Sequence, residues 1–442
     1  MTTDTIAALS TPTGVAALAV IRLSGPESRS IIDQLITIKV PWEPGRVFYR
    51  TLSHREKMLD DVVLTFWQTP HSFTGEDTVE ISCHGNPYIV ESILRACLKL
   101  GARAARPGEF TQRAYLNDKL SFTQAEGLLD LLYAPTERAL ASARAMQQGK
   151  LGHALEAIRA ELVDLLSHLE ASLDFAEEGI EPRVGPEFAA RVEQIRAKVA
   201  QLLRAAPLGR ILQEGALAVI IGEPNVGKSS LLNMLLREDR AIVAPTPGTT
   251  RDLIEASCSV RGLPLRLIDT AGQRDSTDPV EVEGARRART LLPQAQLLLH
   301  VIEAHQPFAP AKIELPENVP LLLIANKSDL GLHPSLPTDA ISLCALTGDG
   351  LANLEARIES TLLAGLSDET ETVLTLNARQ DATLQRAAAS LDRALESLRA
   401  QAGLEITSLE LRDALHDLAE VIGETNNEDI LTRLFQNFCI GK

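Results

Sequence analysis

The sequence lacks the long apolar runs and the paired cysteines that mark several common protein classes. No stretch approaches the roughly 20 uninterrupted apolar residues of a membrane helix, and the start MTTDTIAALS has no basic flank before its apolar residues. We therefore expect a cytoplasmic protein with no membrane association. The five cysteines are scattered without CxxC spacing, so their pattern indicates neither a disulfide framework nor a zinc site.

Positive charge and aromatic side chains are also scarce. The chain has 43 Lys and Arg against 59 Asp and Glu, a net charge of −16, and 4% aromatic residues. Proteins that grip nucleic acid directly usually carry a basic face, and single-strand binders add aromatic stacking platforms. The composition therefore argues against a large direct grip on nucleic acid, and we expect any RNA partner to be held locally or by another subunit.

The length of 442 residues predicts about three domains at roughly 150 residues each. In the first of them, residues 1–118, Val-, Ile- and Leu-rich runs predict strands over 15–23, 59–67 and 78–83. A helical spacing of apolar residues follows over 87–101, from a proline to a glycine. The first domain is therefore expected to be α+β.

The rest of the chain alternates between helical and strand-rich composition. Apolar residues at a spacing of three to four predict helices over 124–132 and 139–176. Four apolar strands then alternate with helices, in ALAVIIG, LPLRLIDTAG, AQLLLHVIE and VPLLLIANKSD, which is typical of a doubly wound parallel sheet. We expect this α/β domain, residues 212–371, to be inserted into a helical domain formed by residues 119–211 and 372–442.

The strand ALAVIIG leads directly into GEPNVGKSS, which places Gly222 four residues before Gly227, Lys228 and Ser229. Glycines allow backbone N–H groups to wrap a phosphate chain, the lysine reaches the β and γ oxygens, and the serine hydroxyl can bind Mg²⁺ at a helix N-terminus. A chance match in a glycine loop is the alternative, which the preceding strand and following helix make improbable.

Two further segments follow in the order that a nucleotide switch requires. In PGTTRD, Thr250 can bind Mg²⁺ when a γ-phosphate is present; in DTAG, Asp269 suits the metal shell and Gly272 the γ-phosphate. Each segment alone could be an ordinary surface loop. Together they indicate a phosphate-sensing switch.

A fourth segment, ANKSD, supplies Asn326, Lys327 and Asp329 at the end of an apolar strand. A carboxylate can accept two hydrogen bonds from the N1 and N2 donors of guanine, and adenine offers no such pair. All four segments in order predict a GTPase that prefers GTP to ATP.

These motifs resemble those of the translation-factor-related GTPases, and the flanking motifs resemble the family of tRNA-modifying GTPases called MnmE or TrmE. The resemblance covers essentially the whole chain, through FTGEDTVEISCHG, RPGEFTQRAYLNDKL, QAEGLLDLL and the terminal CIGK. It implies a homodimer held by a folate-binding-like N-terminal domain. It also implies a flavin-containing partner of the MnmG or GidA type, in a heterotetramer, that holds most of the tRNA. The implied reaction modifies carbon 5 of the wobble uridine of certain tRNAs.

The resemblance further implies a one-carbon folate, 5-formyl- or methylene-tetrahydrofolate, as a cofactor. The matching folate-binding positions are Arg22, Glu80, Lys119 and Lys442. Without the resemblance, these residues would be interpreted as surface charges. Cys439 is either a small buried residue or a functional thiol near the folate site.

One departure concerns the segment before the first long strand. The family usually has a Gly-Arg-Gly-Gly run there, and this chain has Gly14-Val15-Ala16-Ala17. Glycine permits a close backbone approach that larger residues forbid.

The resemblance implies that K⁺ takes the place of an arginine finger. The ion would be bound by Asn225 and by oxygens of Ala244, Thr246 and Thr249, and completed when two G domains pair. A simpler interpretation of Asn225 is that a small polar residue tolerates the turn.

The resemblance also indicates which residue positions the water that attacks GTP. It implies that Glu281, within DSTDPVEVEG, acts on the water in catalysis. Gln273 follows DTAG directly, at the position of the water-orienting glutamine of Ras-like GTPases, and by position alone is an alternative. The triplet Cys344, Ala345 and Leu346 matches a base-specificity loop in which the Ala345 N–H meets the guanine oxygen.

The complete set of residues expected to bind GTP combines these loops. They are Asn225, Val226, Gly227, Lys228, Ser229, Ser230, Ala244, Pro245, Thr246, Pro247, Gly248, Thr249, Thr250, Asp269, Thr270, Ala271, Gly272, Asn326, Lys327, Ser328, Asp329, Cys344, Ala345 and Leu346, with Mg²⁺ on Ser229 and Thr250.

Two other functions remain possible at this point. A ribosome-assembly GTPase switch would use the same α/β domain without one-carbon chemistry, but such proteins commonly carry a basic RNA-binding module. A scaffold with a degenerate nucleotide site is disfavoured by the intact Lys228, Asp269 and Asp329.

Overall fold

The computed structural model describes residues 4–177, 185–237, 255–269, 291–308, 316, 318–364, 374–424 and 428–442, with side chains at 174–177, 255, 269, 428–430 and 433 left out. Within these ranges, no helix combines the length and the apolar composition that crossing a bilayer requires. The described residues divide into two compact units, one from residues 1–129 with 419–442 and the other from residues 130–418.

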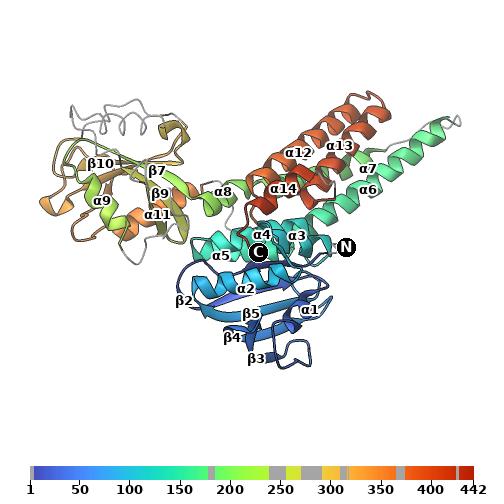
Figure 1. Cartoon of the computed structure of the whole chain (residues 1–442). Helices are drawn as coiled ribbons and strands as arrows, with labels where there is room; N and C mark the ends of the chain where they lie inside the picture. Colours follow the sequence, from blue (N-terminus) through green and yellow to red (C-terminus); the bar gives the residue numbers. More distant parts are fainter. Residues whose placement is uncertain are drawn as a thin grey trace, which may run out of the picture. The chain divides into compact units, whose positions relative to one another are not determined.

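The first unit is built on a six-stranded sheet with the order β3-β4-β5-β2-β1-β6 (Figure 1). All strand pairs are antiparallel except β1 with β6. The strands are β1 (Ile6–Leu9), β2 (Ala16–Ser24), β3 (Val47–His54), β4 (Lys57–Trp67), β5 (Thr78–Gly85) and β6 (Arg103–Ala104). The helices that belong to it wholly or in part are α1 (Ser28–Asp33), α2 (Pro87–Lys99), α3 (Glu109–Leu116), α4 (Phe122–Tyr133), α13 (Leu404–Ile422) and α14 (Glu428–Gln436).

Period-two alternation gives this sheet one buried and one partly open face. Ile21, Leu64 and Ile81 point to the same face, where they pack with buried residues of α1 and α2. Arg22 and Glu80, which are direct cross-strand neighbours, point to the opposite face. The strand pattern therefore positions two of the predicted folate residues together.

The second unit contains a six-stranded sheet with the order β12-β11-β10-β7-β9-β8, in which only the β8–β9 pair is antiparallel (Figure 1). The strands are β7 (Ala216–Ile221), β8 (Glu255–Val260), β9 (Leu263–Asp269), β10 (Leu297–Glu303), β11 (Leu321–Asn326) and β12 (Ile341–Ser342). Helices α9 (Lys228–Leu235) and α11 (Leu351–Leu362) and the short helices η2 (Leu292–Gln294) and η3 (Ser328–Leu330) complete the described part of this α/β domain. Parallel strands β7, β9, β10 and β11 end at one edge, where ligands of doubly wound sheets bind.

The chain enters and leaves this α/β domain through helices. These are α5 (Glu137–Gln147), α6 (Lys150–Glu177), α7 (Pro186–Leu203) and α8 (Ala206–Glu214) before it, and α12 (Ala378–Arg399) after it. Helix α7 packs against both α6 and α12. The multidomain fold class is confirmed: an α+β part, a helical part and an inserted α/β domain. The exact domain boundaries stay a prediction.

The expected single helix over 139–176 is wrong, because the structure breaks it into α5 and α6 around Gly149. Gly149 has φ +78°, a left-handed conformation that ends a helix and that glycine adopts without a Cβ penalty. The apolar spacing continues on both sides of the break, which is why periodicity alone did not reveal it.

Candidate functional site

The phosphate loop joins the carboxyl end of β7 to the first residue of α9. Gly222 and Gly227 both have positive φ, +147° and +99°. A Cβ on Gly222 would lie 2.3 Å from the carbonyl oxygen of Val301, and one on Gly227 would lie 2.1 Å from Nδ2 of Asn326. The tight packing of this loop on its neighbours therefore requires glycine at both positions.

The cationic end of Lys228 lies inside this loop. Its Nζ donates to the carbonyl oxygens of Gly222 at 2.9 Å and Glu223 at 2.7 Å, and the residue is 7% exposed. Ser229 and Ser230 follow in the first turn of α9, and Asn225 has φ +64°. An ammonium group beside the N-terminus of a helix is a donor set that fits the phosphates of a nucleotide.

The base-binding loops are tied to the phosphate loop by Asn326, which is 2% exposed. Its Nδ2 donates to the carbonyl oxygen of Val226 at 2.9 Å, and its Oδ1 accepts from the backbone N–H of Ala345 at 3.0 Å. A backbone bond from Ser328 N–H to the carbonyl of Leu343 adds a second link at 3.1 Å. Three segments that the sequence analysis assigned to GTP thus meet at one point.

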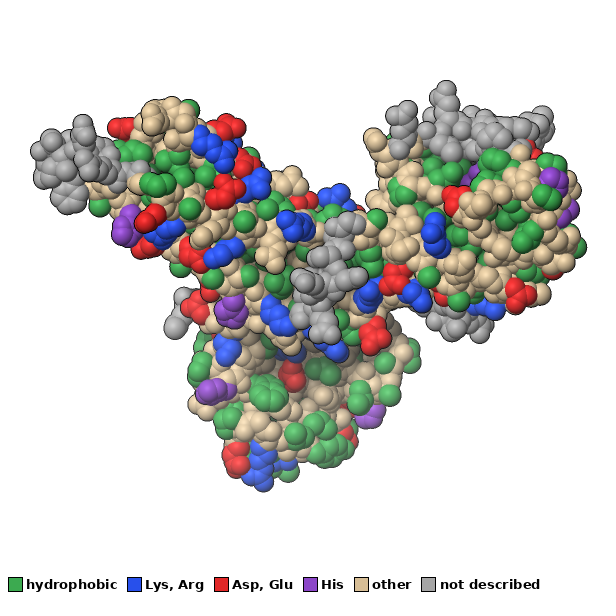
Figure 2. All heavy atoms as spheres, turned by 180° about the vertical axis from the view of Figure 1, so that it is seen from behind, with side chains coloured by type: hydrophobic (Ala, Val, Ile, Leu, Met, Phe, Trp, Pro, Cys, Tyr) green, Lys and Arg blue, Asp and Glu red, His purple; other side chains and the backbone are tan. Residues whose placement is uncertain are grey.

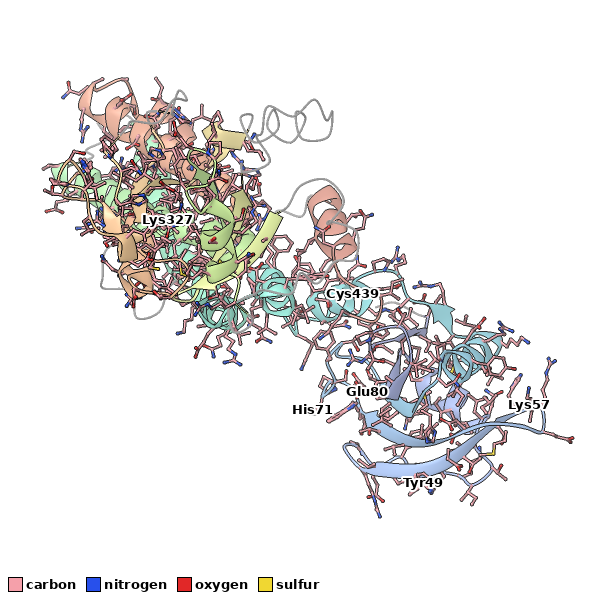
Figure 3. All side chains as sticks on the ribbon, turned by 90° about the vertical axis from the view of Figure 1, so that its left-hand side faces the viewer. Tyr49, Lys57, His71, Glu80, Lys327 and Cys439 are labelled. Carbon is pink, nitrogen blue, oxygen red and sulfur yellow. The ribbon has the colours of Figure 1, made fainter. Side chains whose placement is uncertain are left out.

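The remaining predicted base residues surround this junction. Asp329 is exposed and makes no ion pair with any residue that the structure describes, so its carboxylate is available to guanine donors. Cys344 is buried, and its N–H donates to the carbonyl of Asp349 at 2.9 Å. Leu346 is 81% exposed. Lys327 forms an ion pair with Glu303, a residue that the sequence analysis did not single out (Figure 3 labels Lys327).

Several predicted site residues lie outside the described residues. They are Ala244, Pro245, Thr246, Pro247, Gly248, Thr249, Thr250, Thr270, Ala271, Gly272, Gln273 and Glu281. Asp269 ends β9, but its side chain is not described. The K⁺ loop, the Thr250 ligand of Mg²⁺ and the catalytic assignment of Glu281 therefore remain predictions.

A second cluster forms on the open side of the sheet in the first unit. The Arg22 guanidinium pairs with Glu80, with Nη2 at 2.7 Å and Nε at 3.0 Å from the same carboxylate oxygen. Its carbon Cζ lies 5.7 Å from the ring centres of both Phe73 and Phe110. Arg22 and Glu80 are thus engaged with each other rather than separately available, and two aromatic rings flank the pair.

The C-terminal segment reaches the same cluster. Ser10 Oγ donates to the carbonyl oxygen of Gly441 at 3.1 Å, and a Cβ on Gly441 would lie 2.2 Å from the carbonyl oxygen of Leu9. Burial, and then the nearby positive charge of Arg22, hold the pKa of Lys442 below its usual value. Cys439 is exposed, which contradicts its interpretation as a small buried residue.

Lys119 lies beside the FTGED segment. A Cβ on Gly75 would be 3.3 Å from Cγ of Lys119, and Asn117 Nδ2 donates to the carbonyl of Thr74 at 2.7 Å. Neither Lys119 nor Lys442 forms an ion pair with a residue in the described ranges. Their two ammonium groups are therefore more available to an anionic ligand than the paired guanidinium of Arg22.

A buried ion network, which the sequence analysis missed, supports this cluster. Arg113 is 2% exposed; its guanidinium donates to Asp4 Oδ1 at 2.8 Å and to Glu76 Oε2 at 3.0 Å. Glu109 accepts from Arg103 Nη2 at 2.5 Å. Phe73 and Glu76 come from FTGED, and Glu109 and Phe110 from RPGEFT, so the two motifs together build the corner that holds Arg22.

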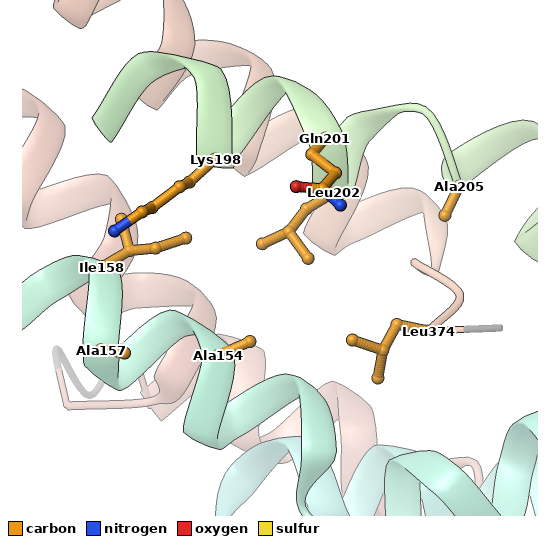
Figure 4. Close-up of a pocket in the computed structure, with 8 residues that line it drawn as sticks. All are labelled: Ala154, Ala157, Ile158, Lys198, Gln201, Leu202, Ala205 and Leu374. Carbon is orange, nitrogen blue, oxygen red and sulfur yellow. The ribbon is translucent and has the colours of Figure 1, made fainter. Parts of the chain in front are cut away.

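The helical part holds a cavity of about 450 Å³ that is separate from these clusters (Figure 4). It is lined by Ala154, Ala157, Ile158, Lys198, Gln201, Leu202, Ala205 and Leu374, none of which is a predicted site residue.

Comparison with known proteins gives matches over nearly the whole chain. Residues 122–439 match the family model described as the MnmE helical domain, and residues 5–119 match the model described as the GTP-binding protein TrmE N-terminus. The chain is 43% identical to the tRNA modification GTPase MnmE of Chloroflexus aurantiacus, with 99% of this chain and 100% of the relative covered. Relatives with the same description from Synechococcus sp. (strain JA-3-3Ab) and Akkermansia muciniphila are each 40% identical. The alignments cover 99% of this chain in both cases, and 98% and 99% of the respective relatives.

Proposed function

The chain belongs to the MnmE family of tRNA modification GTPases, and from this premise we propose the particular reaction that it serves. It hydrolyses GTP to GDP and phosphate and, with a flavin-containing partner, takes part in forming a 5-carboxymethylaminomethyl-type group on the wobble uridine of certain tRNAs. A one-carbon folate, 5-formyl- or methylene-tetrahydrofolate, supplies the carbon. Because tRNA is the substrate, we place the protein in the cytoplasm.

The observation that carries the GTP part of this proposal is the Asn326 bridge. Through Val226 and Ala345 it holds the phosphate loop and both base loops at the carboxyl edge of one sheet. Asp329 accepts hydrogen bonds from the N1 and N2 donors of guanine. The Ala345 N–H already donates to Asn326 Oδ1 and is therefore not free to meet the base oxygen. Lys228 reaches the β and γ phosphates from within its loop.

Hydrolysis needs charge neutralisation beside the phosphates. Mg²⁺ on Ser229 and Thr250, and K⁺ on Asn225 with the Ala244–Thr249 loop, would supply positive charge to the transferring phosphoryl group when bound. Lys228 adds a fixed cation from the chain itself. Glu281 orients the attacking water.

This assignment makes hydrolysis depend on the monovalent cation. GTP turnover by the intact protein is expected to be faster in K⁺ than in Na⁺ at equal ionic strength. Equal rates in the two salts would reject the K⁺ site and leave the GTPase assignment untouched.

The folate part of the proposal is supported by the cluster of Arg22, Glu80 and Lys442. The Arg22–Glu80 pair offers one face with both donors and acceptors, as a pterin ring requires, and Phe73 and Phe110 flank it. Lys442 and Lys119 carry the charge that attracts the glutamate carboxylates.

A homodimer through the open sheet face fits this cluster. The face, here defined by Leu18, Val47, Tyr49, Val63 and Trp67, runs on from the row that contains Arg22 and Glu80. Four of these five apolar side chains are exposed by 40% or more (Figure 3 labels Tyr49 and Glu80 on this sheet). An exposed apolar patch of this kind is typical of an association surface.

The dimer is tested by light scattering with a matched pair of variants. Tyr49→Asp on the open face is expected to yield monomers. Tyr88→Asp, equally exposed at 66% against 65% but on α2, should leave the dimer intact. A monomeric wild-type protein would reject the dimer.

The tRNA is expected to be held largely by the flavin-containing partner, in a heterotetramer. On the side of the molecule seen in Figure 2, Lys and Arg side chains are scattered among acidic ones over the described residues. The net charge of −16 agrees with a limited direct grip.

The decisive experiment is nucleoside mass spectrometry of tRNA from cells that lack this protein. Wobble uridine without the 5-substituent supports the proposal, and restoration by the wild-type chain completes it. The alternative, a ribosome-assembly GTPase, predicts normal tRNA and defective subunits, and gives no reason for a lysine to lie beside Arg22.

A further inference from the structure

Two neighbouring strands of the α/β domain end in residues that form an ion pair. Strand β10 ends at Glu303 and β11 ends at Asn326, and these two residues are direct partners in the parallel register. Lys327 follows Asn326, and its Nζ pairs with Oε1 of Glu303. Glu303 thus lies directly beside the ANKSD loop.

A histidine lies near the other oxygen of the Glu303 carboxylate. His305 Nε2 lies 3.6 Å from Oε2 of Glu303. The backbone fixes both segments, because the Ala304 N–H donates to the carbonyl of Asn326 at 2.7 Å and the His333 N–H donates to the carbonyl of Ala304 at 2.8 Å. The two strand ends are therefore fixed relative to each other by their backbone, and the ion pair with Lys327 orients the Glu303 carboxylate.

Lys327 has little other means of orientation. Its backbone is left-handed, with φ +60°, and its side chain is 33% exposed. A lysine stem of four methylene groups can cover an apolar surface while the ammonium group is held elsewhere. Holding such a long side chain in one conformation costs conformational entropy. An ammonium group that is already anchored keeps the lysine stem in place, so less entropy is lost when the stem covers a ligand.

We propose that Glu303 is a positioning residue for guanine binding, which acts by anchoring the ammonium of Lys327 so that the lysine stem covers one face of the base. The inference rests on the proposed guanine site, in which Asp329 holds the edge of the base. Glu303 itself does not touch the nucleotide. Its contribution therefore disappears when Lys327 has no charge to anchor.

The test measures dissociation constants and dissociation rates of fluorescent GDP with the intact protein. Glu303→Gln is expected to weaken GDP by about tenfold, mainly through faster dissociation. Lys327→Met should lose a similar factor, and the Glu303→Gln/Lys327→Met double variant should be no weaker than Lys327→Met alone. Glu303→Asp keeps the charge on a shorter stem and should recover part of the affinity.

Inosine diphosphate distinguishes contacts with the face of the base from hydrogen bonds to its edge, because hypoxanthine lacks the N2 amino group of guanine. Because the stem covers the ring face, Glu303→Gln should weaken inosine and guanosine diphosphates by the same factor. Glu359→Gln is the matched control: Glu359 pairs with Arg138 and Arg261, outside the base loops, so GDP affinity should stay within twofold.

Three binding results would overturn the inference. They are a Glu303→Gln affinity within twofold of wild type, a full additional loss on top of Lys327→Met, or a loss confined to guanosine. A wild-type protein that fails to bind GDP would instead reject the proposed function. A Glu303→Gln protein with an unfolding midpoint well below that of Glu359→Gln would show a structural role, and the inference would be wrong.

Discussion

The amide of Asn326 donates to the carbonyl oxygen of Val226 at 2.9 Å, across 100 positions of sequence. The same side chain accepts from the N–H of Ala345 at 3.0 Å. One buried amide thus satisfies a donor and an acceptor from two other loops. Movement of any one of the three loops breaks a hydrogen bond to the others.

Removing that amide should affect both stability and nucleotide affinity. Asn326→Ala leaves the Val226 carbonyl and the Ala345 N–H without their partner, at about 1–3 kcal/mol for each buried group. We expect GDP affinity to fall at least tenfold and the unfolding midpoint to drop, measured by fluorescence titration and thermal denaturation. Asn233→Ala, on an exposed position of α9, is the control and should change neither. Equal behaviour of the two variants would contradict the bridging role.

Gly441 is expected to be essential for the folate side of the protein but not for GTP turnover. In Gly441→Ala the new Cβ would lie 2.2 Å from the Leu9 carbonyl, so the C-terminal segment must move away from Arg22. Folate binding by the intact protein should fall at least tenfold while basal GTP turnover stays within twofold. Gly101→Ala is matched, with φ +111° against +99° and no atom within 4 Å of its Cβ, so it should bind folate normally. Equal loss in both variants would indicate backbone strain rather than displacement of the segment.

Acid should weaken the first unit through Glu109. Burial alone would raise the pKa of Glu109, but the hydrogen bonds and charge of Arg103, with the Arg106 N–H, lower it to about 2. A carboxyl whose folded pKa lies below its usual value of 4.5 stabilises the fold above pH 4.5. That stability, up to about 3 kcal/mol, is lost as the pH falls from 4.5 toward 2.

Denaturation of the wild type between pH 6 and about 3 should therefore show a declining free energy of unfolding. The free energy of unfolding of Glu109→Gln should be lower at pH 6 and should decline less steeply as the pH falls. Glu91→Gln removes an exposed helical pair with Arg95 in the same unit and should leave the slope unchanged. A wild-type slope that survives Glu109→Gln would assign the acid sensitivity to other carboxyls.

Two residues outside the described ranges are candidates for positioning the attacking water, and their variants distinguish them. Glu281→Ala is expected to lower the turnover number for GTP by about 10² or more, with GTP affinity near wild type, because a water-positioning group is lost. Gln273→Leu should lose far less. Single-turnover rates in the reverse order would move the catalytic role to Gln273.

The sequence locates the phosphate and base loops more completely than the cluster around Arg22, for a physical reason. A phosphate loop is a local motif: strand, glycines, lysine and helix are consecutive, so spacing alone identifies it. The strands β7, β9, β10 and β11 follow equally from their apolar runs. Glu303 escaped notice because its partner Lys327 lies just beyond the end of the neighbouring strand, 24 positions away.

The first unit depends on contacts that sequence reasoning cannot supply. The sequence analysis did not single out Arg113, yet this residue is buried against Asp4, 109 positions earlier. From sequence alone a charged residue is predicted to be exposed, because charged side chains are almost never fully buried unless they are paired. The same limit applies to the helix break at Gly149, where apolar spacing continues through a glycine that reverses the backbone.

The contact between Ser10 and Gly441 determines how late in translation the Arg22 cluster can be completed. A ribosome completes Ser10 and the whole sheet of the first unit long before it adds Gly441, 431 positions later. The nascent N-terminal part can form its strands early, but the lysine beside Arg22 is added only after the nucleotide loops. A shortened translation product would therefore carry the nucleotide loops without the completed Arg22 cluster.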